Sequence, residues 1–316
     1  MKLVIVGAGY VGLTAAVCFA EMGNEVVCVE TNRDKLELLQ SATLPIFEPY
    51  LDTLFQHNVA VKRLRFVSSL DTVNHLVDIY FICVGTPSQP TGECDLSYVF
   101  DAARAIADHV KGPAIVVTKS TVPVGTGDQI AEIIQSVLPP ALQSQVAVVS
   151  NPEFMKEGVA VDDFMSPDRI ILGLNDDAAL PALQQLYAPF TRKSDRIIVM
   201  KRRDAEMSKY VANAMLANRI SFMNEMALIS DQCGADIEAV RKGVGSDQRI
   251  GEYFLYAGCG YGGSCFPKDV SALIALAQQH ELSPMMLHAV QARNYHQKQY
   301  LFDKLSNYYG ASLKGR

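Results

Sequence analysis

The chain has 316 residues, of which 49% are hydrophobic and 20% charged, as is typical of a globular protein with two well-buried cores. The formal net charge of −6 excludes the broad basic surface with which proteins hold nucleic acid. No apolar run approaches the roughly 20 residues that cross a bilayer, so we expect a cytoplasmic protein without a membrane or nucleic-acid partner.

The first predicted strand, Leu3–Val6, leads directly into Gly7-Ala8-Gly9-Tyr10-Val11-Gly12. The apolar run is shorter than the core of a signal peptide. The glycine spacing is that of a dinucleotide-binding fingerprint, which allows a tight turn, a close approach of the backbone to a pyrophosphate, and close packing of helix on strand. The pyrophosphate would rest on the amino terminus of the following helix. We therefore predict that this segment binds a cofactor, through Gly7, Gly9, Tyr10, Val11 and Gly12.

The second predicted strand, Val26–Val29, ends at Glu30. A carboxylate at this place accepts hydrogen bonds from the ribose hydroxyls and repels a 2′-phosphate, which favours NAD over NADP. Arg33 and Lys35 follow closely. Their positive charges either weaken the preference for NAD over NADP, with Lys35 at the cofactor, or the two residues lie exposed in the first turn of a helix.

Further segments rich in Val and Ile predict strands buried on both faces, and hence a Rossmann-like, doubly wound parallel sheet with helices on each side. These segments are Ile79–Val84, Ile115–Thr118, Val146–Val149, Ile170–Leu172 and Ile197–Val199. Thr86 and Thr121 follow two of the strands, at the carboxyl edge where such sheets bind ligands. Both are candidate contacts to the cofactor or to water.

Two carboxylates, Glu153 and Glu157, follow the strand at 146–149 with the spacing of one helical turn. Beside a cofactor they would be candidate general bases. The alternative is that they belong to the charged first turn of a helix.

The segment Lys201–Cys233 contains neither Gly nor Pro and predicts one helix of up to about 45 Å, ended by Gly234. It places the domain boundary near residue 200, between an α/β domain (1–200) and an all-helical domain (201–316). Lys209 and Asn213 share one face of this helix, where they would either direct an ammonium and an amide to one oxygen or form a solvated surface. The apolar residues exceed one buried stripe, which predicts a homodimer. They include Val211, Met215, Leu216, Ile220, Met223 and Leu228.

The seven cysteines are odd in number and form no C-x-x-C pair, which is typical neither of a disulfide framework nor of a zinc site, so we expect no metal. Cys18, Cys28 and Cys83 lie in apolar patterns and are predicted core residues. Cys265 differs, because it stands in Gly260-Tyr261-Gly262-Gly263-Ser264-Cys265-Phe266-Pro267-Lys268-Asp269, just before a proline suited to a first helical turn. A thiol at a helix amino terminus near Lys268 is expected to have a pKa below the roughly 8.5 of a free cysteine, which makes Cys265 a candidate nucleophile. Its alternative is a small buried residue in a glycine loop.

Taken together, these motifs resemble those of the UDP-glucose/GDP-mannose dehydrogenase family. The resemblance covers the whole chain, through the segments Gly7–Gly12, Val84–Pro87, Thr118–Thr126, Asn151–Gly158, Lys209 with Asn213, Arg249–Gly251 and Gly260–Asp269. Cys259 stands where a proline is common in the family. The family normally continues into another Rossmann-like domain that clasps the nucleotide, whereas this sequence ends at Arg316, where the first strand of that domain would begin.

The resemblance implies an NAD-dependent, four-electron oxidation of the C6 alcohol of UDP-glucose to the carboxylate of UDP-glucuronate. In the family mechanism Cys265 adds to an enzyme-held aldehyde as a thiohemiacetal, and oxidation gives a thioester that is hydrolysed. Lys209 and Asn213 would stabilise the developing oxyanion. Asp269 and Glu153, with Thr121, would position or deprotonate water.

The resemblance also implies the remaining contacts. Glu157 and Lys268 would lie at the cofactor, and Glu153, Phe154, Tyr253 and Gly262 would contact the substrate together with Lys209, Asn213 and Cys265. Arg249 would reach the substrate across a dimer interface. Three alternatives remain open: oxidation of GDP-mannose, a two-electron hydroxyacid dehydrogenase, and an inactive NAD-binding and dimerisation fragment.

Overall fold

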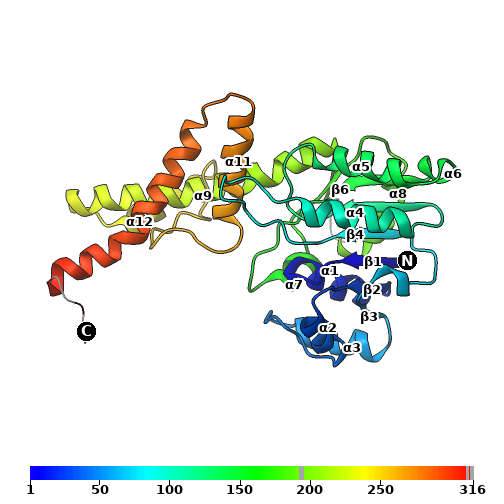
Figure 1. Ribbon diagram of the computed structural model, residues 1–316. Coiled ribbons are helices and arrows are strands. Elements are labelled where there is room, and N and C mark those ends of the chain that lie inside the picture. The colour runs from blue at the N-terminus through cyan, green and yellow to red at the C-terminus, as the bar shows by residue number, and fades with distance from the viewer. Residues whose placement is uncertain (192–195, 311–312, 314–316) are drawn as a thin grey trace. The chain divides into compact units, whose positions relative to one another are not determined.

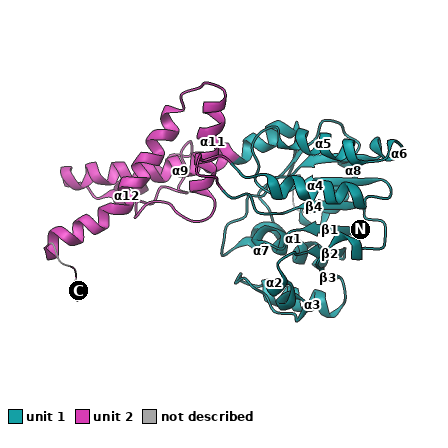
Figure 2. Ribbon diagram, in the orientation of Figure 1, with its two compact units in different colours: residues 1–87, 94–209 teal, residues 88–93, 210–316 magenta. Residues whose placement is uncertain are grey.

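The computed structural model describes residues 1–191, 196–310 and 313. The chain forms two compact units, one of residues 1–87 and 94–209 and the other of residues 88–93 and 210–316 (Figure 2). The end of the predicted second domain, at Arg316, lies outside the described residues.

The first unit is built on an eight-stranded sheet in the order β3-β2-β1-β4-β5-β6-β7-β8 (Figure 1). Its strands are β1 (Lys2–Val6), β2 (Glu25–Val29), β3 (Leu64–Val67), β4 (Ile79–Ile82), β5 (Ala114–Thr118), β6 (Val146–Ser150), β7 (Ile170–Gly173) and β8 (Ile197–Met200). All seven predicted strands are present, and β3 was not predicted. Its residues Leu64 and Phe66 join the first core, while Val67 is partly buried against the second and Arg65 is exposed.

The pairing of β6 with β7 departs from the predicted parallel sheet. These strands meet antiparallel, with Ser150 opposite Gly173, while the other pairs in the sheet are parallel. The connection between them, residues 151–169, contains one short helix, α7 (Ala160–Met165), and antiparallel neighbours need no crossover from one end of the sheet to the other. The sheet is therefore mostly, and not wholly, parallel.

Helices cover both faces of the sheet because side chains alternate along each buried strand. Along β1, Leu3 and Ile5 join one core while Val4 joins the other. The first core packs against α1 and α7, and the second against α4 and α5. The helices and 3₁₀ turns of this unit are α1 (Tyr10–Glu21), α2 (Arg33–Gln40), α3 (Leu51–Ala60), η1 (Leu70–Thr72), α4 (Ser97–His109), α5 (Thr126–Val137), α6 (Pro140–Gln143), α7, α8 (Leu180–Tyr187) and η2 (Ala188–Phe190). This arrangement confirms the doubly wound α/β fold.

The turn from β1 into α1 needs its glycines. Gly7 has φ +100°, and a Cβ added at Gly12 would lie 2.0 Å from the Gly7 carbonyl oxygen. No side chain fits at either place. Cys18, Cys28 and Cys83 are buried around this turn and in the adjoining core, as predicted, and burial raises the pKa of the Cys83 thiol to about 12.

The second unit is helical. It holds most of α9 (Arg202–Cys233) together with α10 (Ile237–Gly245), α11 (Phe266–Gln279) and α12 (Met285–Tyr309) (Figure 1). The predicted long helix is confirmed, and it ends before Gly234, whose φ is +69°. The helical turn predicted at Pro267 corresponds to the start of α11, whereas α10 was not predicted.

A small core joins the helices of this second unit, formed by Ala217, Tyr261, Val270, Ile274 and Val290. The segment Ser88–Glu93, from the connection between β4 and α4, belongs to this unit as well. The Gln279 side chain donates to Glu93 Oε1 at 2.7 Å, so the segment is held by α11. No helix in the described part of the chain has the length and apolar character needed to cross a membrane.

Candidate functional site

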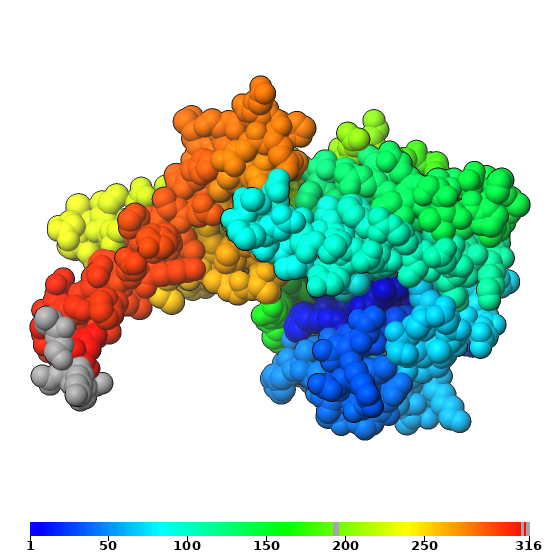
Figure 3. Space-filling model, viewed as in Figure 1, coloured from blue at the N-terminus to red at the C-terminus, as the bar shows by residue number. Residues whose placement is uncertain are grey.

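A cleft lies along the carboxyl ends of β1, β2 and β4. The cleft has a volume of about 1510 Å³, part of it open to solvent. Its lining includes Val6–Gly9, Val29–Thr31, Ser68–Asp71 and Cys83–Gly85. Figure 3 shows it as a hollow between α4 and the blue segment of α2 and α3, with dark blue residues of the amino-terminal segment on its floor. The amino terminus of α1 opens into this cleft through Gly9, which suits a pyrophosphate. The cleft therefore fits a dinucleotide.

Glu30 and Lys35 both line this cleft. Glu30 Oε2 lies 3.0 Å from Lys35 Nζ, and Glu30 Oε1 accepts from the Asn32 amide at 2.9 Å. Lys35 is thus not the exposed helix residue of the alternative interpretation. Arg33 is exposed and pairs with Glu37 at 2.9 Å. A ribose in this cleft would meet a carboxylate that already has an ammonium partner.

Tyr10 and Val11 begin α1, directly after the fingerprint turn. The Tyr10 hydroxyl donates a hydrogen bond to the carboxylate of Glu48. Burial, and next the bond to Glu48, raise the pKa of Tyr10 well above its ordinary value, so the phenol keeps its proton. Glu48 had no role in the sequence interpretation, since no local motif marks it.

The segment Asn151–Gly158 follows β6 as a loop. No helix forms until Ala160, so the helical turn proposed for Glu153 and Glu157 is wrong. Pro152 disfavours a helical backbone at the residue before it, and Gly158 has φ +92°, outside the helical region. Glu153 instead folds back, and its Oε2 accepts from the Met155 amide at 2.7 Å.

Glu153 forms a buried ion pair with Lys209. Glu153 Oε1 lies 3.1 Å from Lys209 Nζ, and the two side chains are 8% and 6% exposed. Lys209 Nζ also lies 5.1 Å from the centre of the Phe154 ring, whose other cationic neighbour is Arg169, with the guanidinium carbon at 4.1 Å. Loop and helix are thereby held together by charge and by cation–π contacts.

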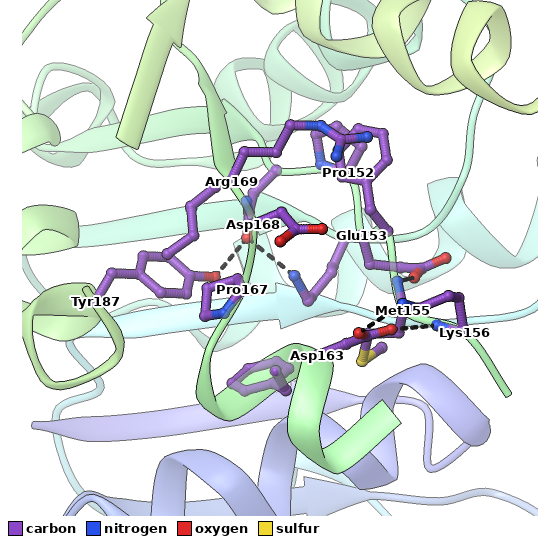
Figure 4. A pocket seen from close by; sticks show the side chains of 14 residues that line it. Pro152, Glu153, Met155, Lys156, Asp163, Pro167, Asp168, Arg169 and Tyr187 are labelled. Carbon is purple, nitrogen blue, oxygen red and sulfur yellow. Dashed lines mark hydrogen bonds and ion pairs between the residues drawn. The ribbon is translucent and has the colours of Figure 1, made fainter. Parts of the chain in front are cut away.

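A pocket lies behind this loop, between β6 and the segment from α7 to β7 (Figure 4). Figure 4 shows Tyr187 entering it from one side and Glu153 and Lys156 standing on the other. Asn151 Oδ1 accepts from the Tyr187 hydroxyl at 2.5 Å and from Lys119 Nζ at 3.2 Å. Burial lowers the pKa of Lys119. Lys119 was not predicted to matter, although it stands in the motif that contains Thr121.

Thr86 and Thr121 are brought together, since the Thr86 hydroxyl donates to the Thr121 carbonyl at 3.0 Å. Thr121 and Lys209 also line one small pocket, with Pro152 and Glu206. Glu206 was missed by the sequence analysis. It is 3% exposed and accepts from the Gly125 and Gly127 amides, both at 2.7 Å, and burial raises its pKa. Glu206 thus ties α9 to the turn that begins α5.

In the second unit, Cys265 is the residue immediately before α11, and Pro267 lies in the first turn, as predicted. Its side chain is exposed, and Sγ lies 3.5 Å from the Ser264 hydroxyl. The alternative of a buried structural cysteine is therefore wrong. The structure places the thiol at the amino terminus of α11.

Asp269 is the centre of a polar cluster in the first turn of α11. It is 1% exposed, its Oδ2 accepts from Asn213 Nδ2 at 2.6 Å, and its Oδ1 lies 2.7 Å from Lys268 Nζ. The Asp269 amide donates to the Cys265 carbonyl at 2.9 Å. The structure thus brings together four of the predicted residues: Asn213, Cys265, Lys268 and Asp269.

The long helix α9 carries both Lys209 and Asn213, one turn apart. Both side chains are buried, at 5% and 6% exposure, so the alternative of a solvated helix face is wrong. One residue is bonded to Glu153 and the other to Asp269. An ammonium and an amide are therefore held on one continuous helix by two separate carboxylates.

The remaining predicted substrate residues lie on the surface of the second unit. Tyr253 is 81% exposed, and a Cβ at Gly262 would meet no atom within 4 Å. The Arg249 side chain is 89% exposed and pairs with Asp247 at 2.7 Å. Among the described residues, no cluster of three or more His, Cys, Asp and Glu side chains is suited to a metal ion.

The second unit carries an exposed thiol, Cys265, and a buried amide–carboxylate pair, Asn213 with Asp269, while the first unit carries the buried pair of Lys209 with Glu153. In general a thiol can act as a nucleophile, and a buried ammonium or amide can donate to an oxyanion. The two buried carboxylates, Glu153 and Asp269, can hold those donors or accept a proton.

Comparison with known proteins gives a consistent result. Residues 1–191 match the sequence model of the UDP-glucose/GDP-mannose dehydrogenase family, NAD binding domain, and residues 203–296 match that of the family's central domain. The chain is 50% identical over 317 residues to a UDP-glucose 6-dehydrogenase of Pseudomonas aeruginosa, covering 100% of this chain and 70% of the relative.

Solved structures are similar over nearly the whole chain. A UDP-glucose dehydrogenase from Pyrobaculum islandicum has a TM-score of 0.92 at 38% identity, over 98% of this chain and 71% of the other. A GDP-mannose dehydrogenase from Pseudomonas aeruginosa has a TM-score of 0.74 at 31% identity, over 97% of this chain and 71% of the other.

Proposed function

Because the chain belongs to the UDP-glucose/GDP-mannose dehydrogenase family, we propose that it oxidises the C6 alcohol of UDP-glucose to the carboxylate of UDP-glucuronate. The enzyme is an NAD-dependent oxidoreductase. The observation that carries the proposal is the exposed Cys265 thiol at the start of α11, beside the buried Asn213–Asp269 pair. The 50% identity to a UDP-glucose 6-dehydrogenase supports the choice of sugar nucleotide.

Cys265 divides the reaction into two oxidations. Bound NAD supplies the hydride acceptor for each. After the alcohol has become an aldehyde, the thiolate adds to the aldehyde carbon and forms a thiohemiacetal. Loss of a second hydride and the hydroxyl proton gives a thioester, and water then releases the carboxylate and the free thiol. One sugar therefore yields two NADH.

Lys209 and Asn213 are the proposed donors to the oxyanion that develops on C6. Their partners Glu153 and Asp269 hold them in place at 3.1 and 2.6 Å. We assign to these carboxylates, with Thr121, the further role of directing or deprotonating the hydrolytic water. Thr86, Glu157 and Lys268 are proposed cofactor contacts, and Phe154, Tyr253 and Gly262 proposed substrate contacts.

The chain is proposed to work as a homodimer. Several apolar side chains of α9 are exposed, among them Val211 at 46%, Met215 at 56% and Phe222 at 55%. A second copy would cover them. Arg249 would then reach the substrate of the partner.

The experiment follows NADH per sugar with the complete natural protein. Wild type should form two NADH per UDP-glucose, Cys265→Ser should lose efficient turnover because a hydroxyl is the weaker nucleophile, and intact-protein mass spectrometry should detect a sugar adduct on wild type only. Cys259→Ser is the matched control, since Cys259 is another exposed cysteine six residues earlier. Two NADH per sugar from Cys265→Ala would refute the covalent mechanism.

The same assay separates the alternatives. Faster turnover of GDP-mannose would reassign the substrate, and one NADH per sugar would indicate a two-electron dehydrogenase. NAD binding without any turnover would indicate a binding and dimerisation module.

A further inference from the structure

Glu48 is a buried carboxylate in the loop between α2 and α3. It is only 4% exposed, although its neighbour Phe47 is 91% exposed. Among the residues that the structure describes, no Lys, Arg or His forms an ion pair with it. A buried carboxylate without such a partner is costly unless hydrogen bonds satisfy it. Its hydrogen bonds therefore indicate what the residue does.

Three donors satisfy the Glu48 carboxylate, and they come from two distant parts of the chain. Oε2 accepts from the Tyr10 hydroxyl and from the Gly158 amide at 2.9 Å, while Oε1 accepts from the Ala160 amide at 2.7 Å. Tyr10 is the first residue of α1 and directly follows Gly9, which lines the dinucleotide cleft. Gly158 and Ala160 end the loop that carries Glu153 and Glu157. One side chain thus connects the cofactor turn with the loop that holds the base.

The loop depends on this connection at a place where its backbone is unusual. Gly158 has φ +92°, and α7 begins two residues later at Ala160. Without Glu48, the amide of the exposed Gly158 and the amide of the buried Ala160 would lose their acceptor, and the turn that directs Glu153 toward Lys209 would lose its anchor. Glu48 itself belongs to neither the lining of the cleft nor the ion pair with Lys209.

We infer that Glu48 is a positioning residue that couples occupation of the dinucleotide cleft to the conformation of the loop 151–158. Cofactor contact at the start of α1 fixes the Tyr10 side chain, which fixes Glu48, which fixes the Gly158 and Ala160 amides. By linkage, an ordered loop must strengthen cofactor binding by the same factor. The inference rests on the proposed function in one respect, namely that the loop carries the catalytic base.

Two variants break different halves of this connection. Tyr10→Phe removes the hydroxyl group but leaves both hydrogen bonds that Glu48 accepts from the backbone amides. Glu48→Gln keeps the size of the side chain, but its NH2 group cannot accept, so at least one amide loses its acceptor. Glu132→Gln is the matched control, because Glu132 is exposed on α5.

The experiment measures hydrogen exchange of the amides of residues 153–160 in the full chain, with and without NAD. NAD should slow exchange of this segment in wild type and in Glu132→Gln, by about tenfold if the coupling equals one net hydrogen bond. In Tyr10→Phe and Glu48→Gln this protection should largely disappear. The KM for NAD should rise in both, and kcat should fall further in Glu48→Gln, which disturbs the loop directly.

Equal protection by NAD in wild type, Tyr10→Phe and Glu48→Gln would overturn the coupling. If Glu48→Gln does not fold, Tyr10→Phe alone decides, because it leaves the loop anchor intact. Failure of the proposed function has a different signature: wild type would not oxidise UDP-glucose, while the effect of NAD on exchange could still be measured.

Discussion

Substitutions in the buried ion pair between Glu153 and Lys209 should change stability and activity independently. In Glu153→Gln the side chain keeps its shape, and its one remaining acceptor serves either the Met155 amide or Lys209, but not both as the carboxylate does. The charge on Lys209 then has no carboxylate at 3.1 Å, within a site where both side chains are less than one-tenth exposed.

Removing one partner of a buried ion pair costs about 3–5 kcal/mol, because the other charge stays buried and uncompensated. Lys209 keeps its contact with the Phe154 ring at 5.1 Å, which favours the low end of this range, about 3 kcal/mol. A domain of this size loses about 2 °C or more of Tm for each kcal/mol, so we expect Tm to fall by about 6 °C.

The double variant Glu153→Gln/Lys209→Met separates the charge from the packing. It removes the stranded ammonium, so it should recover at least about 2 kcal/mol relative to Glu153→Gln. Turnover should be lost in the double variant, because the proposed donor to the oxyanion is missing. Urea unfolding of the four proteins in the cycle, with NADH formation measured in parallel, supplies both readouts. A double variant no more stable than Glu153→Gln would show that Lys209 does not depend on the carboxylate.

Three further predictions concern single residues. Burial lowers the pKa of Lys119 below the ordinary 10.5. At a pH below this lowered pKa the folded protein must bury a charged ammonium, which reduces the free energy of unfolding. At a pH above 10.5 the amine is neutral in both the folded and the unfolded state, so the reduction disappears. Lys119→Met should therefore raise the free energy of unfolding at pH 7 and less so toward pH 10.5, with the exposed Lys111→Met as control; an equal effect at both pH values would contradict this. Glu30→Gln should narrow the preference for NADH over NADPH in fluorescence titrations, since the repulsion of a 2′-phosphate is reduced, and an unchanged ratio would count against that role. Met215→Glu should convert the proposed dimer to a monomer in light scattering; a monomeric wild type would disprove the dimer itself.

Local sequence patterns predicted seven of the eight strands and several of the helices. Apolar runs identified seven strands, the absence of Gly and Pro identified α9, and Pro267 identified the start of α11. These features depend on neighbouring residues, so the sequence contains what is needed to predict them. The antiparallel pairing of β6 with β7 has no such local signal, because the direction in which two strands pair is decided by how distant segments pack.

Long-range contacts explain what the sequence analysis missed at the site. Glu206 bonds to an amide 81 positions away, and Glu48 to one 112 positions away. Each is a single Glu with no flanking motif. Glu153 and Glu157 misled for the opposite reason, because their helical spacing is real but the segment is a loop, in which Glu153 Oε2 accepts from the Met155 amide and Gly158 has φ +92°.

The path of the chain between the two units limits how they can be separated. It passes from one unit to the other after residues 87, 93 and 209, so no single cut releases either unit whole. A fragment that begins at Tyr210 would lack Ser88–Glu93, and Gln279 would lose its partner Glu93. A fragment that stops at Lys209 would keep that segment without α11 to hold it. The two halves of this protein therefore cannot be exchanged among relatives by recombination at one junction, and a chimera would need the six-residue segment from the same parent as α11.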